Sequence, residues 1–159
     1  GQVMAASAQL YEYLRWWEGK GGRPVLAAYR DTNGTWTIGY GSTQNVTPDL
    51  VIDHQEAERR LSAAVGLVVD GMNFSLGAYP LSQQQFDALV SLAYNIGMSA
   101  FRTSSPCLLV KMGKYDRVGP AMELWNKERK NGVLVVNAGL VNRRAADRGI
   151  WERGEYVRP

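Results

Sequence analysis

The chain has 159 residues, of which 45% are hydrophobic and 21% charged. This balance fits one soluble globular domain and argues against a disordered chain. No apolar run approaches the ~18 residues that a membrane-spanning helix needs, and no signal peptide is visible, so we expect no stable membrane insertion. The single cysteine, Cys107, excludes an internal disulfide and is expected to be a buried thiol.

The net charge of +3 is unevenly distributed. Residues 1–99 carry 6 Lys/Arg and 9 Asp/Glu, whereas residues 100–159 carry 12 and 6, giving −3 and +6. A basic C-terminal part predicts attraction to a polyanion: nucleic acid, an anionic membrane or an anionic cell-wall polymer. No helix-turn-helix, zinc or RNA-binding signature accompanies it, so nucleic acid is not the expected partner.

Two kinds of hydrolase chemistry are set aside. The single histidine, His54, has no second His or Cys near it, so we predict a solvated side chain and no metal site. A Ser-His-Asp enzyme would have to use this histidine, and no Gly-x-Ser-x-Gly elbow accompanies any serine. In the absence of a metal or nucleotide motif, we expect no cofactor.

In chain order, apolar spacings of three and four predict a first helix over residues 5–18, which the glycines after Glu18 end. Residues 27–41 alternate as a β-hairpin does, with Asn33-Gly34 at the turn. Asp53 and Glu56 resemble a capping box that opens a helix running through Met72, long enough to bridge two lobes.

Ser82 opens a further helix that ends at Gly97. Three shorter helices are expected, from Pro106 to about Gly113, from about Pro120 to Arg129, and from about Leu140 to Arg153. This order predicts an α+β, mostly α fold over residues 1–159. A small β lobe at about 19–52 and a helical lobe at about 74–159, which includes the N-terminal helix, would meet at a cleft.

Two carboxylates stand in unlike environments near this seam. Glu18 ends the first helix beside Trp16 and Trp17, where the negative end of the helix dipole and burial both disfavour ionisation. A reluctantly ionised carboxyl suits a general acid, although a surface glutamate ending a helix is equally expected from position alone.

Asp31 enters the hairpin turn, where an aspartate commonly binds nearby backbone N–H groups. A three-residue loop with Gly34 left-handed would place Asp31 opposite Thr35 and diagonal to Thr37, so that carboxylate and hydroxyl hold one water. A two-residue loop would turn Thr37 to the other face. Gly39 and Gly41 would leave that face open to a bulky chain.

A series of motifs recurs in one order along nearly the whole chain. Glu18-Gly19 is followed by Tyr29-x-Asp31-x-x-Gly34-x-x-Thr37-Ile38-Gly39-Tyr40-Gly41, then by Ala93-Tyr94-Asn95-Ile96-Gly97, Phe101-Arg102-Thr103-Ser104, Gly139-Leu140-Val141-Asn142-Arg143-Arg144 and Trp151. This series resembles the phage-type lysozymes, the muramidases of glycoside hydrolase family 24. The resemblance implies a lysozyme-like two-lobed fold.

The resemblance also implies roles for individual residues. Glu18 matches the proton donor, Asp31 the second carboxylate, and Thr37 the threonine that holds the attacking water. Inversion at the anomeric carbon is implied, with the carboxylates roughly 6.5–9.5 Å apart. The implied substrate is the β-1,4 bond between N-acetylmuramic acid and N-acetylglucosamine. The substrate-binding candidates are Tyr94, Asn95 and Ser104, which match positions near the family's sugar-binding cleft. A role in packing or in helix capping would explain each of them equally well.

The chain departs from the family pattern at three places. Twelve residues separate Glu18 from Asp31, several more than is usual, which could reshape the mouth of the cleft. Ser42 stands where many relatives have a histidine, and Asp147 where a glutamate is common. None of these changes removes a catalytic group.

Four side chains of the C-terminal part each allow more than one interpretation. Trp125 and Trp151 are expected in the core or between the lobes rather than as sugar platforms. Arg143 and Arg144 would either bind wall carboxylates or line a solvated helix face. A lytic transglycosylase, which needs the acid but no Asp31–Thr37 pair, and a non-catalytic wall-binding module remain the competing functions.

Partners and location follow from the same resemblance. We expect a monomer that acts on peptidoglycan in the bacterial cell wall, made in the host cytoplasm or carried in a virion. Gly1, in place of a starting methionine, favours a domain cut from a larger virion polypeptide over a free endolysin.

Overall fold

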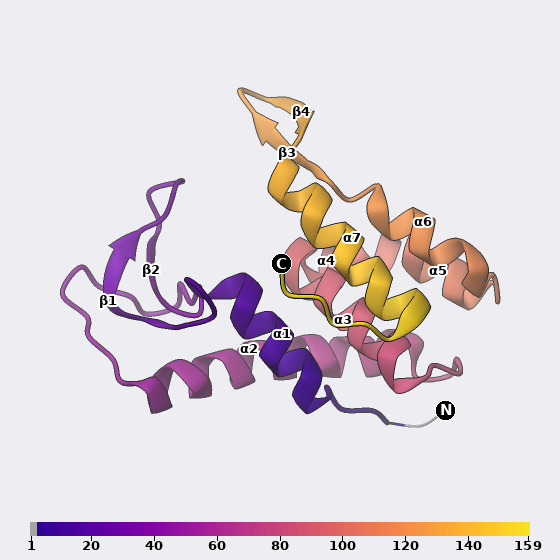
Figure 1. The fold of residues 1–159 in the computed structure, drawn as a ribbon, viewed down its shortest axis with the longest axis horizontal. Coiled ribbons are helices and arrows are strands. Elements are labelled where there is room, and N and C mark those ends of the chain that lie inside the picture. The colour runs from indigo at the N-terminus through magenta and orange to yellow at the C-terminus, as the bar shows by residue number, and fades with distance from the viewer. Residues whose placement is uncertain (1–2) are drawn as a thin grey trace.

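The computed structural model describes residues 3–159, so the expectation that rests on Gly1 lies outside the described residues. The helices and strands are α1 (Ala8–Glu18), β1 (Val25–Arg30), β2 (Trp36–Gly39), α2 (His54–Leu76), α3 (Gln83–Ile96), α4 (Met98–Thr103), α5 (Ser105–Lys111), the 3-10 turn η1 (Tyr115–Arg117), α6 (Val118–Glu123), β3 (Lys127–Lys130), β4 (Val133–Val136) and α7 (Ala138–Arg153). Figure 1 shows two lobes, with the β1–β2 hairpin in one, most helices in the other, and α2 running beneath both. The α+β, mostly α prediction is confirmed.

Helix α1 brings the end of the first segment to the junction of the lobes. It begins at Ala8 because Ser7 is its N-cap and accepts the N–H of Leu10, so the helix starts three residues later than predicted. It ends at Glu18, as expected, and the backbone N–H of Gly19 still bonds to the carbonyl of Arg15. Glu18 is therefore held by helical backbone at the lobe boundary.

The β1–β2 hairpin has the three-residue loop. Tyr29 pairs with Thr37, Asp31 donates its N–H to the carbonyl of Thr35 at 2.9 Å, and Gly34 has φ +79°. This register places Tyr29, Asp31 and Thr37 on one face of the sheet, because opposed residues of an antiparallel pair share a face. Residues 50–52 run along the other edge of β1, where Ala28 and Leu50 form one of the backbone bonds.

Helix α2 connects the two lobes, and α3 lies at the centre of the helical lobe (Figure 1). Asp53 caps α2 through the N–H of Glu56, and its 23 residues span about 34 Å at 1.5 Å per residue. Ser82 and Gln85 complete the capping box of α3 in both directions. Gly97 ends α3 with φ +91°, a conformation that favours glycine.

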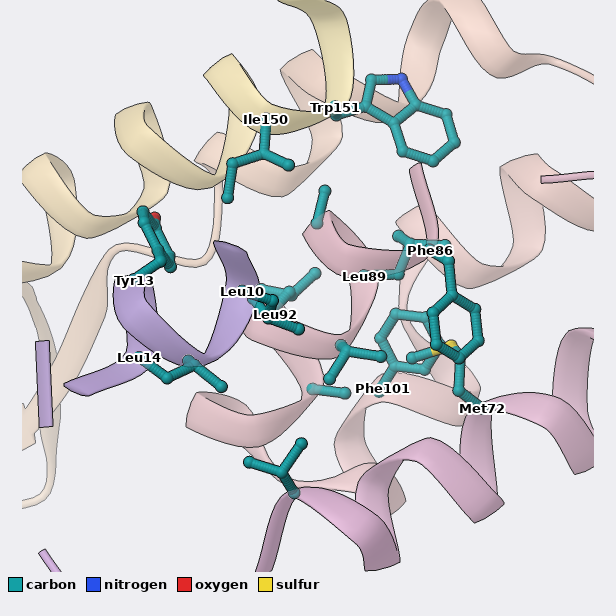
Figure 2. Packing of buried hydrophobic residues seen from close by; sticks show 14 of the residues in the cluster. Leu10, Tyr13, Leu14, Met72, Phe86, Leu89, Leu92, Phe101, Ile150 and Trp151 are labelled. Carbon is teal, nitrogen blue, oxygen red and sulfur yellow. The ribbon is translucent and has the colours of Figure 1, made fainter. Parts of the chain in front are cut away.

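The core gathers around α3, which is buried along most of its length (Figure 2). Its Phe86, Leu89 and Leu92 face side chains from four other helices. These partners include Leu10 and Leu14 of α1, Met72 of α2, Phe101 of α4, and Ile150 and Trp151 of α7. Each fully buried side chain of this size contributes roughly 1.5–3 kcal/mol, so the packing fixes α1 and α7 against α3. Cys107 is buried and Trp151 is in the core, as predicted.

One predicted helix is wrong in its extent, and neither the β3–β4 hairpin nor helix α4 was predicted. The helix expected from about Pro120 to Arg129 ends at Glu123, and residues 127–136 form the β3–β4 hairpin instead. Asn131 (φ +52°) and Gly132 (φ +79°) make its two-residue turn, which suits the twist of a hairpin. Helix α4 was also not predicted. Gly97 ends α3, as the sequence indicates, but it is also the N-cap residue of α4.

Within residues 3–159, no helix is both long enough and apolar enough to cross a membrane.

Candidate active site

Glu18 meets an arginine from the far end of the chain. Its side chain is 21% exposed, and its Oε2 accepts a hydrogen bond from Nη1 of Arg143 at 2.9 Å. The Arg143 guanidinium lies 5.3 Å from the ring of Trp17, a distance at which the ring face attracts a cation. A buried cation beside Glu18 was not predicted from the sequence.

The burial of Arg143 and Arg144 corrects both interpretations made from the sequence. Arg143 is 4% exposed and Arg144 is fully buried, so neither lines a solvated face of α7 or reaches out to a wall carboxylate. Both guanidinium groups lie within 4 Å of a carboxylate oxygen of Asp147. The signal that could have revealed this is the Arg-Arg-x-x-Asp spacing, which places the aspartate one turn after both arginines.

Asp31 directly follows β1, at the start of the hairpin turn. Its Oδ1 accepts the N–H groups of Asn33 at 2.8 Å and Thr35 at 2.9 Å, which is the turn-forming role expected of an aspartate there. These two bonds orient the carboxylate and use only one of its oxygens. Both the turn and the presentation of Oδ2 therefore depend on the same side chain.

Tyr29 is affected by the charges of both carboxylates. Burial raises the pKa of its phenol first, and the negative charges of Asp31 and Glu18 raise it further. Its pairing with Thr37 puts Tyr29 on the sheet face that carries Asp31. The sequence motif contains Tyr29 but indicates no role for it.

Thr37 is on the same sheet face as Asp31 but is packed more deeply. It is 3% exposed, and its Oγ1 donates to the carbonyl of Thr35 at 2.9 Å. A hydroxyl that donates one bond keeps lone pairs that accept others. The Thr37 hydroxyl therefore keeps acceptor capacity on the sheet face that carries Asp31.

Gly39, the last residue of β2, and Gly41 have different surroundings, which corrects one expectation. A Cβ added at Gly39 would meet Ile52 and Ala57, so this glycine faces α2 rather than an open sheet face. A Cβ added at Gly41 would lie 3.8 Å from Oε1 of Glu18. Of these two glycines, Gly41 is therefore the one that leaves space next to Glu18.

Tyr94 of α3 lines the same cavity as Gly41, the glycine next to Glu18, and Asn95 is the following residue of α3. Burial and then the charge of Glu18 raise the pKa of Tyr94 to about 12. Tyr94 also lines a cavity of about 320 Å³ together with Gly41, Ser42 and Arg60. Asn95 is exposed, and its Oδ1 accepts from Nη2 of Arg144 at 2.6 Å, which leaves the amide N–H groups as donors.

Ser104 is not brought to this group. It is 4% exposed, donates to the carbonyl of Phe101 at 2.6 Å and accepts from the N–H of Cys107. Its hydroxyl is thus used to cap α5, the alternative that the sequence left open.

The unusual spacing between Glu18 and Asp31 is absorbed locally. Lys20 and Arg23 exchange two backbone hydrogen bonds around Gly21 and Gly22, which have φ +60° and +77°. The Nζ of Lys20 then lies 4.2 Å from the centre of the Tyr29 ring. At the second departure, the hydroxyl of Ser42, an uncharged acceptor, accepts a hydrogen bond from Nη1 of Arg60 at 3.1 Å.

The described residues contain no group of three or more His, Cys, Asp or Glu side chains placed to bind a metal ion. Two lobes joined by a long helix, with one carboxylate from each at the junction, define the lysozyme class of glycoside hydrolases.

Comparison with known proteins gives the family. The phage lysozyme family model matches residues 12–147, and the chain belongs to this family. It is 36% identical over 127 residues to an endolysin of Acyrthosiphon pisum secondary endosymbiont phage 1, covering 80% of this chain and 86% of that one. It is 39% identical to an endolysin of Bacillus phage PZA over 81% of this chain, which is only 49% of that longer protein.

Solved structures agree on the fold. An endolysin from Escherichia coli O157:H7 phage FAHEc1 superposes with a TM-score of 0.90 at 32% identity, over 98% of both chains. The muramidase domain of SpmX from Asticaccaulis excentricus superposes with a TM-score of 0.83 at 30% identity, over 93% of this chain and 97% of that one. The lysozyme-like fold expected from the motifs is thereby confirmed.

Proposed function

We propose that this protein cleaves peptidoglycan in the bacterial cell wall, hydrolysing the β-1,4 bond between N-acetylmuramic acid and N-acetylglucosamine. Glu18 protonates the leaving glycosidic oxygen. Asp31 and Thr37 hold a water on the opposite side of the sugar, and Asp31 accepts its proton as the water attacks the anomeric carbon. Attack from the opposite side inverts that carbon.

The observation that carries this proposal is that two carboxylates, Glu18 and Asp31, have unlike surroundings and that the charges of both act on the phenol of Tyr29. Glu18 is bound by one guanidinium, whereas Asp31 is bound by two backbone N–H groups, so the two carboxyl groups differ in what holds them. Unlike environments around one cleft are what a general acid and a general base require. The phage lysozyme family membership and the muramidase title of one structural relative support the choice of bond.

The decisive experiment measures products on purified peptidoglycan. The wild type is expected to release muropeptides with reducing ends, and Glu18→Gln to lower the rate by about 100-fold or more while keeping the fold. Glu12→Gln, which removes an exposed carboxylate from the same helix, is the matched control and should retain full activity.

Other outcomes separate the competing functions. Products with 1,6-anhydro ends would identify a lytic transglycosylase, and binding without new chain ends would identify a wall-binding module. Full activity in Glu18→Gln would overturn the assignment of the acid.

We propose further that residues 1–159 act as one monomeric catalytic domain, either free or within a larger virion polypeptide. Light scattering of the purified chain tests the first part, because a dimer would give twice the mass of 17.6 kDa.

Catalysis by two carboxylates uses no metal. Activity is therefore expected to be unchanged by excess chelator, and loss of activity that returns on adding a divalent cation would contradict this mechanism.

A further inference from the structure

A buried ionic cluster lies behind Glu18. It combines Arg143, Arg144 and Asp147 of α7, and we call these three residues the α7 cluster. All three are at most 4% exposed. Tyr13 of α1 and Ser91 of α3, both fully buried, each donate a hydroxyl hydrogen bond to Oδ1 of Asp147, at 2.7 and 2.6 Å. Three helices thus fix the Asp147 carboxylate in one place.

Arg143 divides its charge between two carboxylates. Its Nη1 donates to Glu18 at 2.9 Å, and its Nε lies 3.7 Å from Oδ1 of Asp147. Its Nη2 donates to Ser91 at 3.3 Å, so the guanidinium cannot turn fully towards either partner. Burial acts to lower the pKa of Arg143, but the charges of Asp147 and then Glu18 outweigh it and raise the pKa.

Asp147 acts on the two arginines by charge rather than by hydrogen bonds. Within residues 3–159, Nε of Arg143, Nε and Nη1 of Arg144, and Oδ2 of Asp147 are buried with no hydrogen-bond partner. The aspartate is one methylene shorter than the glutamate common at this position, and its nearest contact with Arg144 is 3.3 Å. At these distances in a buried site the Coulomb interaction remains large.

This arrangement answers a difficulty in the proposed mechanism. A general acid must carry its proton when the substrate binds, and a buried cation beside it favours loss of that proton. Two arginines lie behind Glu18, and the Asp147 carboxylate lies within 4 Å of both guanidinium groups as their counter-charge.

We infer that Asp147 is a positioning residue whose negative charge offsets the charges of Arg143 and Arg144, so that Arg143 holds Glu18 without the uncompensated charge of two arginines acting on its carboxyl group. The catalytic role of Asp147 rests on the proposed function. Its electrostatic effect on Glu18 can be tested by titration whether or not the proposed function is correct.

The other groups that face Glu18 and Arg143 do not supply this balance. Tyr13 of α1 is neutral, because burial and then Asp147 raise the pKa of its phenol far above the ordinary value. Tyr94 of α3, with a pKa of about 12, and Tyr29 of β1, whose pKa is also raised, are neutral as well. Asp31 is the remaining anion on this side, and it is the same in every variant below.

The experiment is a titration of Glu18 in the folded protein, followed by carbon NMR after labelling the glutamate carboxyl carbons. The signal of Glu18 is assigned by its absence in Glu18→Gln. Asp147→Asn keeps a carbonyl oxygen for Tyr13 and Ser91 but removes the charge, so the titration midpoint of Glu18 should fall by about one pH unit. Asp147→Glu keeps the charge and should restore the wild-type midpoint.

A second variant changes the charge in the opposite direction. Arg144→Gln removes one cation from the cluster, so the midpoint of Glu18 should rise. In Asp147→Asn the amide nitrogen of the new side chain would face Nε of Arg144, and this variant could fail to fold for that reason. Arg144→Gln then still tests the inference. An unchanged midpoint in whichever of the two variants folds, or shifts of the same sign in both, would overturn the inference.

Activity gives the second readout. The alkaline limb of the pH profile of kcat/KM should move down in Asp147→Asn and stay in place in Asp147→Glu. A merely structural role would lower the rate at every pH without moving this limb. If the wild type releases no muropeptides at all, the proposed function fails, while the NMR titration still decides the role of Asp147.

Discussion

Thr37 is almost fully buried, yet the proposed mechanism assigns it a water. Its hydroxyl donates to the carbonyl of Thr35, which directs its remaining lone pairs away from the strand backbone. The register of the hairpin puts this hydroxyl on the face that carries Asp31. The residue therefore contributes both to packing and to the geometry of the site.

Replacing Thr37 with valine separates these two contributions. Thr37→Val keeps the shape of the side chain and loses one hydrogen bond, so the free energy of unfolding should fall by only about 1 kcal/mol. The value of kcat should fall by about 10-fold or more, because the water is no longer fixed. Thermal unfolding and initial rates measure the two effects, and an unchanged kcat would remove Thr37 from the mechanism.

The turn that follows β2 matters because of what a side chain there would touch. Gly41 has φ +81°, which L residues rarely adopt, and a Cβ at this position would approach Oε1 of Glu18. Gly113 has φ +72° and open space around its Cβ position. The two glycines thus share a backbone conformation but differ in their neighbours.

Alanine substitutions at these glycines make a matched pair. Gly41→Ala and Gly113→Ala should each lose about 1 kcal/mol of unfolding free energy through backbone strain. Only Gly41→Ala should also lose activity, because its methyl group would occupy the space next to the Glu18 carboxyl group. Equal activities in the two variants would show that the space beside Glu18 is not required.

The two hairpins show how far local sequence signals reach. Asn33-Gly34 correctly placed the first turn, and of the two loop lengths considered the structure has the three-residue loop, which puts Asp31 and Thr37 on one face. Asn131-Gly132 carries the same signal before the β-branched run of β4, but the helix-forming residues of β3 concealed it. The second hairpin was therefore predictable, and the prediction failed by giving propensity more weight than the turn.

The buried ion pairs could not be read in the same way. Glu18 and Arg143 are 125 residues apart, and their contact depends on how α1 and α7 both pack on α3. Local pattern describes each helix separately and does not give the rotation of one against another. The carboxylates could thus be proposed from the motif, but the cation that binds one of them required the structure.

At the scale of the whole molecule, the charge count overstates the basic surface of the C-terminal part. Arg143 and Arg144 contribute to its +6, yet both are buried beside Asp147 and Glu18. The attraction to a polyanion predicted from the count therefore depends on the exposed cations, such as Lys127, Arg129 and Lys130 of the β3–β4 hairpin. This hairpin projects from the helical lobe in Figure 1.

A surface ion pair connects α1 to the long helix and should make stability depend on pH. Arg15 donates two hydrogen bonds to Glu58, and this pairing lowers the pKa of Glu58 below its ordinary value of 4.5. A carboxyl whose pKa is lower in the folded protein stabilises it above the unfolded pKa. This stabilisation is lost as the pH falls below 4.5 towards the folded value.

Glu58→Gln should therefore reduce the loss of unfolding free energy between about pH 5 and about pH 3. Denaturant titrations across this range measure it, with Glu12→Gln as the control for removal of an exposed carboxylate from α1. The same slope in all three proteins would mean that the Arg15–Glu58 pair contributes nothing to acid stability.

The distance along the chain between Glu18 and Arg143 also has a consequence for synthesis. Glu18, the proposed acid, leaves the ribosome early. Arg143, whose guanidinium binds Glu18, emerges only when most of the chain has been made. Helix α1 cannot complete its packing until α7 arrives, so a nascent or truncated polypeptide lacks a working site. A wall-cleaving enzyme built in this way becomes active only once it is nearly finished.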